Sequence, residues 1–202
     1  MRRKSGTDGD SFMLYKFAKR SFDIIFSILL AILFIPLWII VPIAISADSR
    51  GRVIYTQKRV GLASRYFTIY KFRSMKEGTP DIPTDRVRDQ EMLNTRVGTF
   101  LRRFSVDEIP QLVNILKGDM SFVGPRPALY NQDYLIALRK EKGVDMIRPG
   151  VTGLAQVNGR DALTIEQKVD YDFKYLKTAT FSLDLKILFM TTRAALNGQG
   201  AN

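Results

Sequence analysis

The sequence predicts an α+β protein that is mainly helical and carries a re-entrant membrane helix-break-helix near its N-terminus. Three observations support this: a long uncharged apolar run interrupted by Pro36, two short β-rich stretches after it, and amphipathic helical patterns over much of the remainder. With 202 residues, the chain has room for one compact domain plus an anchor. We therefore expect a basic N-terminal segment over 1–20, a re-entrant membrane hairpin over 21–47 and a cytoplasmic domain over 48–202.

The apolar run covers residues 24–45 without one charge. As a straight helix it would reach about 33 Å, enough to cross a hydrocarbon core of roughly 30 Å. Pro36 removes a backbone hydrogen bond and predicts a kink, which leaves two arms too short to cross alone.

Basic residues flank the run on both sides. They are Lys16, Lys19, Arg20, Arg50, Arg52, Lys58 and Arg59. The positive-inside tendency would keep both ends of the run, and so both termini, on the cytoplasmic side. These observations favour the re-entrant form. A fully spanning helix with a proline kink and a cleaved signal peptide are the alternatives.

The remainder alternates β-rich, polar and helical stretches. Residues 53–57 and 65–72 are rich in β-branched and aromatic residues and predict a hairpin. The helical patterns lie at 97–104, 109–116, 130–142, 165–176 and 183–196, and several of these helices are expected at the membrane interface. Residues 77–94 are expected to be a mobile loop, and the glycine-rich 148–161 an ordered loop.

The amino-acid composition restricts the binding partners, catalytic groups and metal ligands that the protein can use. Of the net charge of +11, nearly all lies in the first 76 residues, which indicates an anionic partner such as a nucleic acid or the cytoplasmic leaflet of a membrane. The chain has no cysteine and no histidine. This excludes disulfides, thiolate nucleophiles, a histidine base and the usual zinc ligands. A metal would need oxygen ligands, which favours Mg²⁺ or Mn²⁺.

Two adjacent carboxylates, Asp107 and Glu108, stand in the stretch FSVDEIP. One interpretation is a capping box, with Ser105 as N-cap, Glu108 at the third helical position and Asp107 at the positive end of the helix dipole. The other is that the dipole holds Asp107 ionised as a metal ligand or as a nucleophile toward phosphorus. Both remain open, since successive helical residues point about 100° apart and one acid can cap while the other reacts.

Phosphoryl chemistry at this pair would need a divalent cation and several basic side chains. The candidates are Lys71, Arg73, Arg102, Arg103, Arg126, Arg148 and Arg160. For each of them a solvated surface position is the simpler explanation. Arg126 differs, because Pro125 and Pro127 stiffen the backbone that presents it.

Three motifs carry a family resemblance: KFRSM at 71–75, LRRFSVDEIPQLVNILKGDMSFVGPRP at 101–127 and RPGVTGLAQVNGRD at 148–161. In this order, after an apolar segment, they resemble the bacterial sugar transferase family of monotopic phosphoglycosyl transferases, over residues 16–196. The resemblance implies transfer of a sugar-1-phosphate from a UDP-sugar to undecaprenyl phosphate, with release of UMP. Such a reaction would initiate assembly of O-antigen, capsule, exopolysaccharide or glycoprotein glycan at the cytoplasmic face of the inner membrane.

The resemblance also implies residue roles. Asp107 would be the nucleophile that forms a phosphosugar-aspartyl intermediate, and Glu108 would serve in metal binding, orientation or proton handling. Both carboxylates are the implied ligands of Mg²⁺, with Mn²⁺ as a substitute. The implied substrate-binding residues are Lys71, Arg73, Arg102, Arg126, Arg148, Arg160 and Asp172. One departure is that Ile35 precedes Pro36, where small members often have serine.

The expected partners are a UDP-sugar donor, undecaprenyl phosphate as acceptor, an anionic phospholipid bilayer and downstream glycosyltransferases. The main rival function is a non-catalytic membrane-surface adaptor. Nucleic-acid binding is disfavoured, because the basic excess flanks an apolar segment rather than an element that reads a groove.

Overall fold

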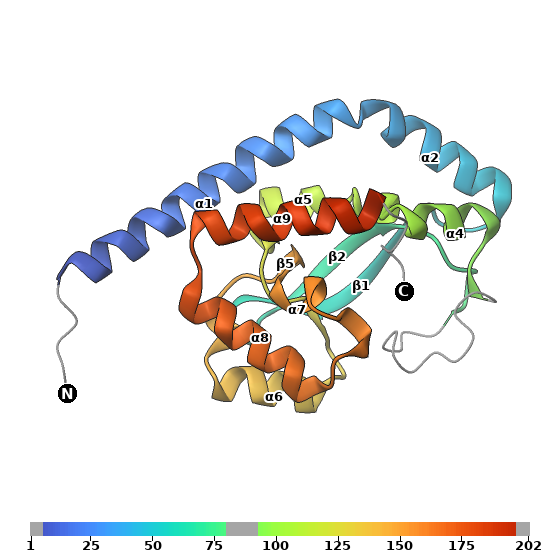
Figure 1. Ribbon diagram of the computed structural model, residues 1–202. Coiled ribbons are helices and arrows are strands. Elements are labelled where there is room, and N and C mark those ends of the chain that lie inside the picture. Colours follow the sequence, from blue (N-terminus) through green and yellow to red (C-terminus); the bar gives the residue numbers. More distant parts are fainter. Residues whose placement is uncertain (1–5, 80–92, 197–202) are drawn as a thin grey trace.

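The computed structural model describes residues 6–79 and 93–196 as two small sheets enclosed by helices, as Figure 1 shows. The helices are α1 (Gly6–Leu33), α2 (Ile35–Asp48), α4 (Arg96–Arg103), α5 (Gln111–Lys117), α6 (Asp133–Glu141), α7 (Leu154–Val157), α8 (Ile165–Thr178) and α9 (Phe181–Leu196). The strands are β1 (Ile54–Val60), β2 (Tyr66–Phe72), β3 (Ser121–Val123), β4 (Ala128–Leu129) and β5 (Gly150–Thr152). The predicted α+β, mainly helical class is confirmed.

Helices α1 and α2 form an arch over a row made by α4, α5 and α9 (Figure 1). The two helices meet at Phe34 with a bend of 62°. The prediction put the break at Pro36, but this proline lies in the first turn of α2, where a backbone N–H has no intrahelical partner to lose.

Among the described residues no single helix is long and apolar enough to cross a bilayer, whereas α1 from Met13 and α2 qualify jointly as one bent pair. Helix α1 passes residue 20 without interruption, and the proposed domain boundaries stay a prediction.

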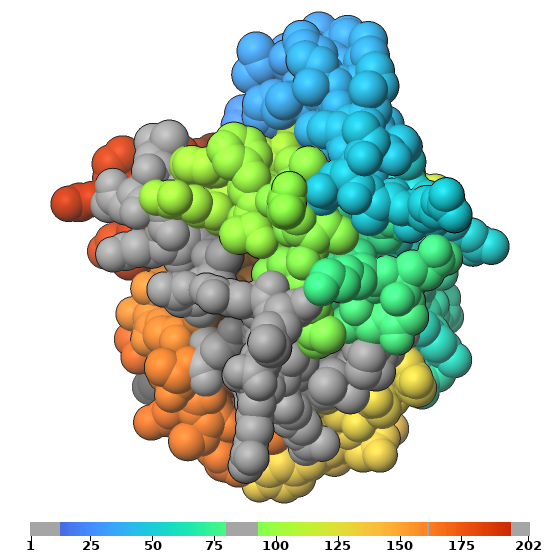
Figure 2. All heavy atoms as spheres, turned by 90° about the vertical axis from the view of Figure 1, so that its right-hand side faces the viewer, coloured from blue at the N-terminus to red at the C-terminus, as the bar shows by residue number. Residues whose placement is uncertain are grey.

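The outer surface of the arch is apolar. Twelve of its large apolar side chains are at least 47% exposed: Met13, Leu14, Phe17, Ile25, Ile28, Leu29, Ile32, Leu33, Ile35, Ile39, Ile40 and Ile43. Figure 2 shows the arch, in blue and cyan, projecting as a ridge above the rest of the molecule. Such a continuous apolar surface is uncommon on a water-exposed protein.

Two charged residues of α1, Arg20 and Asp23, are hydrogen-bonded to the body of the protein. Arg20 donates to the Ile115 and Leu116 carbonyls at the C-terminal end of α5, at 2.7 and 3.0 Å. Asp23 is buried and accepts from the Ser121 hydroxyl and the Phe122 amide, both at 3.1 Å. These contacts fix where the arch leaves the body.

A second polar cluster joins α1 to α8 and α9. The Asp184 carboxylate accepts from Lys19 Nζ at 2.7 Å, from the Tyr175 hydroxyl at 2.6 Å and from the Tyr15 hydroxyl at 3.0 Å. Asp184 and Tyr175 are buried. We call Tyr15, Lys19, Tyr175 and Asp184 the α1 anchor cluster.

The predicted hairpin is confirmed, although β1 extends three residues beyond the expected end. Strands β1 and β2 are antiparallel, with Tyr55 opposite Lys71 and Gln57 opposite Ile69, and the 3₁₀ turn Leu62–Ser64 joins them. Strand β4 pairs with the other edge of β1, and β3 pairs with β5 in parallel. These three strands have two or three residues each and were not predicted, because such short strands have too little periodicity.

The predicted helices are all present, with ends shifted by a few residues. Gly118 ends α5 in the left-handed region at φ 88°, and Thr164 begins α8 with a capping box to Gln167. The segment 148–161 is ordered, as predicted, but includes β5 and the one-turn helix α7. Most of the predicted loop over 77–94 lies outside the described residues.

Asn114 connects α5 to the hairpin and thereby positions the acidic pair. It is fully buried, donates to the Thr68 carbonyl at 2.7 Å and accepts from the Tyr70 amide at 3.1 Å. Because Asp107 and Glu108 come just before α5, this contact sets the acidic turn beside β2.

Candidate active site

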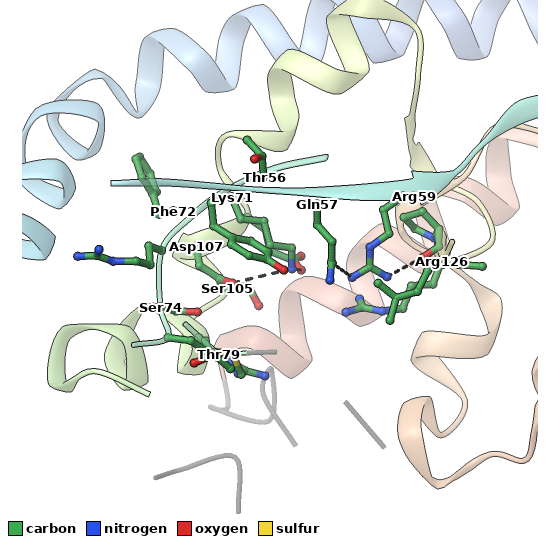
Figure 3. A pocket seen from close by; sticks show the side chains of 18 of the residues that line it. Thr56, Gln57, Arg59, Lys71, Phe72, Ser74, Thr79, Ser105, Asp107 and Arg126 are labelled. Carbon is green, nitrogen blue, oxygen red and sulfur yellow. Dashed lines mark hydrogen bonds and ion pairs between the residues drawn. The ribbon is translucent and has the colours of Figure 1, made fainter. Parts of the chain in front are cut away.

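A cavity of about 460 Å³ opens between the β1–β2 hairpin, the turn that carries the acidic pair, the 126–132 segment and α7. Figure 3 shows its side chains. In that view Lys71 and Asp107 lie toward one end, Arg59 and Arg126 lie at the other, and Gln57 is between them. The cavity therefore joins residues that are far apart in the sequence.

The acidic pair lies in a 3₁₀ turn, Val106–Glu108, rather than in the first turn of an α-helix. Ser105 has φ 56° and its side chain caps nothing, so the predicted capping box is wrong. The left-handed backbone conformation of Ser105 changes the direction of the chain between α4 and the 3₁₀ turn. As a result both carboxylates line the cavity.

Lys71 bridges the two carboxylates. Its Nζ atom lies 2.6 Å from Glu108 Oε1 and 3.9 Å from Asp107 Oδ2. Asp107 is only 7% exposed, and within the described part of the chain no hydrogen bond reaches its carboxylate. Lys71 is thus hydrogen-bonded to Glu108 through Oε1, while its ion pair with Asp107 is longer and leaves the Asp107 oxygen atoms accessible to another partner.

The protein environment shifts the pKa values of the two carboxyl groups in opposite directions. Burial raises the pKa of Asp107 to about 6, with Glu108 adding to the rise and Lys71 opposing it. Burial also disfavours the Glu108 carboxylate, but Lys71 and Arg126 outweigh it and the pKa of Glu108 falls to about 2. The predicted stabilisation of the Asp107 carboxylate by a helix dipole is wrong in its premise, because Asp107 lies in the 3₁₀ turn and not in the first turn of an α-helix. Near neutral pH the Asp107 carboxylate is still mostly ionised, and it is more basic than an ordinary aspartate.

Besides Arg73, four of the predicted cations line the cavity together with the pair: Lys71, Arg102, Arg126 and Arg160. Each of them acts electrostatically on Asp107 or Glu108. A buried carboxylate surrounded by several basic groups can receive a polyanionic ligand, because the cations compensate charge that the acids alone would repel.

Two other predicted arginines bind backbone carbonyls. Arg73 borders the cavity but is buried, and its guanidinium donates to the Ser49 and Arg50 carbonyls at the C-terminal end of α2, both at 2.7 Å. Arg148 lies outside the cavity lining and donates to the Gly118 carbonyl at 2.8 Å. Both arginines donate hydrogen bonds to carbonyl groups at helix C-terminal ends, which lack partners within the helix. Phosphate contact by either residue stays a prediction.

Asp172 does not line the cavity either. It is 1% exposed and pairs with Arg139, whose Nε and Nη2 atoms lie 3.0 and 2.6 Å from Asp172 Oδ2. Burial raises the pKa of Asp172, and Arg139 opposes that rise. The structure thus brings Asp172 next to a residue of the site rather than into it.

Sequence reasoning missed several polar residues of the cavity: Gln57, Arg59, Gln132, Arg139, Gln156 and Lys168. One signal was available, since Tyr55, Gln57 and Arg59 alternate along β1 and alternate residues share a face of a strand. Arg139 had no local signal, because its role depends on α8 and on the 126–132 segment.

The site has a limited set of metal ligands. Within the described residues no group of three or more Asp, Glu, His or Cys side chains gathers as a metal-binding cluster. Among the described residues that line the cavity, the carboxylates are Glu77, Asp107 and Glu108, and of these Asp107 and Glu108 form the pair that shares Lys71. Two carboxylates fit Mg²⁺ when water and substrate phosphates complete its coordination, which is its usual manner of binding in phosphoryl-transfer sites.

Residues 4–198 match the family model described as bacterial sugar transferase. The chain is 38% identical over 195 residues to the UDP-N-acetylgalactosamine-undecaprenyl-phosphate N-acetylgalactosaminephosphotransferase of Aeromonas hydrophila, covering 93% of this chain and 46% of that protein. It is 38% identical over 196 residues to the undecaprenyl-phosphate glucose phosphotransferase of Komagataeibacter xylinus, covering 91% of this chain and 36% of that one. It is also 40% identical over 192 residues to the UDP-glucose:undecaprenyl-phosphate glucose-1-phosphate transferase of Caulobacter vibrioides, covering 91% of this chain and 71% of that protein. The chain thus spans less than half of the first two relatives.

Proposed function

The chain belongs to the bacterial sugar transferase family, as its three motifs predict, and from this premise we propose that it transfers a sugar-1-phosphate from a UDP-sugar to undecaprenyl phosphate. The observation that carries the proposal is the environment of Asp107. This carboxylate is buried at the wall of a cavity of about 460 Å³, accepts no hydrogen bond from the described residues and faces Lys71, Arg102 and Arg126.

The reaction proceeds in two displacements at one phosphorus atom. An Asp107 carboxylate oxygen attacks the β-phosphorus of the UDP-sugar, the bond from that phosphorus to the bridging oxygen breaks, and UMP leaves with the electron pair. A phosphate oxygen of undecaprenyl phosphate then attacks the same phosphorus and releases the carboxylate. A basic, poorly solvated carboxylate suits the first step, because nucleophilicity rises with basicity.

The surrounding cations supply the electrostatic part of catalysis. Arg102, Arg126 and Arg160 line the same cavity and would hold the phosphate oxygens of the donor, while Lys71 is paired with Glu108 beside the proposed nucleophile. Mg²⁺ held by Asp107 and Glu108 would neutralise charge that develops on the leaving UMP. A chain without cysteine or histidine is consistent with this use of carboxylate, lysine and arginine.

The apolar arch supports a membrane location for the reaction. Its exposed apolar surface fits the hydrocarbon region of one leaflet, and α4, α5 and α9 lie in a row beneath it as candidate interface helices (Figure 1). A lipid phosphate and a soluble nucleotide sugar would meet at this boundary, on the cytoplasmic face of the inner membrane. The basic flanks of the arch suit anionic lipid head groups.

Release of UMP tests the proposed function against the adaptor alternative. Detergent-purified protein is incubated with Mg²⁺, undecaprenyl phosphate and a panel of UDP-sugars, and UMP is measured. We expect release with at least one donor and dependence on both the lipid and the metal. If no donor in a broad panel releases UMP, the non-catalytic adaptor becomes the better account.

Accessibility of the termini tests the membrane arrangement. With a cysteine tag at either end of this cysteine-free chain, we expect a membrane-impermeant maleimide to label both tags only after the inner membrane is opened. A control tag on a periplasmic protein should react in intact spheroplasts. Labelling of one terminus from the periplasmic side would indicate a spanning helix.

A further inference from the structure

The backbone of residues 124–127, which carries the Arg126 side chain, is hydrogen-bonded on two sides. On one side, the Gly124 amide donates to the Thr152 carbonyl and the Gly150 amide donates to the Pro125 carbonyl, both at 2.9 Å. A Cβ atom on Gly124 would lie 2.4 Å from the Arg148 carbonyl oxygen, so this close approach requires glycine.

On the other side, two arginines from distant elements donate to consecutive carbonyls. Arg139 of α6 donates through Nη1 to the Arg126 carbonyl at 2.7 Å, and Arg59 of β1 donates through Nη1 to the Pro127 carbonyl at 3.0 Å. Both guanidinium groups border the cavity, while the Arg126 side chain itself is exposed toward it. Figure 3 shows Arg59 beside Arg126.

Asp172 holds one of these two arginines in place. It accepts from Nε and Nη2 of Arg139, which leaves Nη1 for the Arg126 carbonyl. The planar guanidinium fork makes these three contacts at once, which a lysine ammonium on a flexible stem does not reproduce.

We propose that Arg59 and Arg139 are positioning residues that fix the Arg126 side chain for contact with the donor diphosphate, and that Asp172 acts by orienting Arg139. For its activity readout this inference rests on the proposed function. It gives a role to Asp172, which the family resemblance implies as a substrate-binding residue but which lies outside the cavity lining. It also assigns two cavity arginines to backbone support.

The central variant is Arg139→Lys. It keeps a positive partner for the buried Asp172, so the fold is retained, but it loses the fork that reaches the Arg126 carbonyl. We expect kcat/KM for the UDP-sugar to fall about tenfold, against about 100-fold for Arg126→Ala. The matched control is Lys142→Gln, which removes an exposed ion pair with Asp170 between the same helices, α6 and α8, and should change kcat/KM less than twofold.

A double-mutant cycle separates positioning from direct contact. If Arg139 acts only through Arg126, the Arg126→Ala/Arg139→Lys protein should stay within about twofold of Arg126→Ala. Losses that multiply would mean that Arg139 contacts the substrate itself, and full activity of Arg139→Lys would mean that the contact does nothing. Either result overturns the proposal.

Amide hydrogen exchange tests the same contacts without any turnover. In Arg139→Lys, and in Arg59→Lys as a second variant, the peptide over 121–132 should exchange faster than in the wild type, while Lys142→Gln leaves it unchanged. If the wild-type protein releases no UMP, the proposed function is wrong, but the proposed backbone support can still be tested by hydrogen exchange. Unchanged exchange in both lysine variants would defeat the backbone support whether or not the protein turns over.

Discussion

The cavity and the α1–α2 arch use charged residues in opposite ways. In the cavity, Lys71, Arg102, Arg126 and Arg160 lie near the Asp107–Glu108 pair, and the Asp107 carboxylate accepts no hydrogen bond from the described residues. In the arch, the charges of α1 that touch the body are bound to it, and apolar side chains fill the outer surface. The difference teaches that a buried acid with several cations near it and no hydrogen bond from the described residues is the better candidate for a reactive group, whereas charges that are hydrogen-bonded to the body fix the position of an element.

The first test of this contrast, with the largest expected effect, is Asp107→Asn. An amide cannot act as the nucleophile, so UMP release should fall at least about 1000-fold while folding and vesicle association persist. Circular dichroism and vesicle flotation check the latter two. Asp170→Asn makes the same chemical change at an exposed position of α8 and should keep near-normal turnover. Substantial activity in Asp107→Asn would show that Asp107 is not the nucleophile.

The second test is Glu108→Gln. The amide retains the shape of the side chain but loses the charge that pairs with Lys71 at 2.6 Å, so Lys71 is freed to approach Asp107 and lower its basicity. We expect UMP release to fall about 100-fold. Glu166→Gln, on the exposed side of α8, is the control. A loss below about threefold would reduce Glu108 to a surface role.

The third test addresses the arch through the α1 anchor cluster. Asp184→Ala leaves Lys19 and the Tyr175 hydroxyl without their shared acceptor, and we expect a loss of about 3 kcal/mol in the free energy of unfolding. Chemical denaturation in detergent measures it. Asp170→Ala, which breaks an exposed ion pair, should cost below about 1 kcal/mol. Equal costs for the two variants would contradict the view that the cluster fixes α1.

The smallest effect on folding is expected at the exposed apolar surface of the arch. Leu29→Ser should change unfolding free energy in detergent by under about 0.5 kcal/mol, because Leu29 is 57% exposed. Its partition onto anionic vesicles should weaken about tenfold, since burial of a leucine in the bilayer is lost. Leu62→Ser, in the hairpin turn, is the control. Unchanged partition of Leu29→Ser would argue against immersion of this surface.

Much of the fold was predictable because its signals are local. A break close to Pro36 was predicted, the hairpin follows from its β-branched and aromatic residues, and the end of α5 follows from Gly118. The exact break at Phe34 was not predictable, because a proline is accepted in the first turn of a helix as readily as it ends one. Strands β3, β4 and β5 depend on partners distant in sequence.

The candidate site was predictable as a set of residue types more than as a geometry. Asp107, Glu108 and Lys71 meet as the motifs imply. The capping box failed because Ser105 adopts positive φ, which its neighbours in sequence do not signal. Arg73 and Arg139 bind backbone carbonyls, and only the folded chain decides whether an arginine faces a ligand or a helix end.

Isolation of the covalent intermediate tests the central claim most directly. The protein is mixed with Mg²⁺ and its UDP-sugar without lipid acceptor, quenched and digested, and the modified peptide is sequenced by mass spectrometry. The account predicts a phosphosugar on Asp107, close to one UMP released for each modified chain, and no adduct in Asp107→Asn. A phosphosugar on another residue, or full turnover with no adduct at any time, would contradict it.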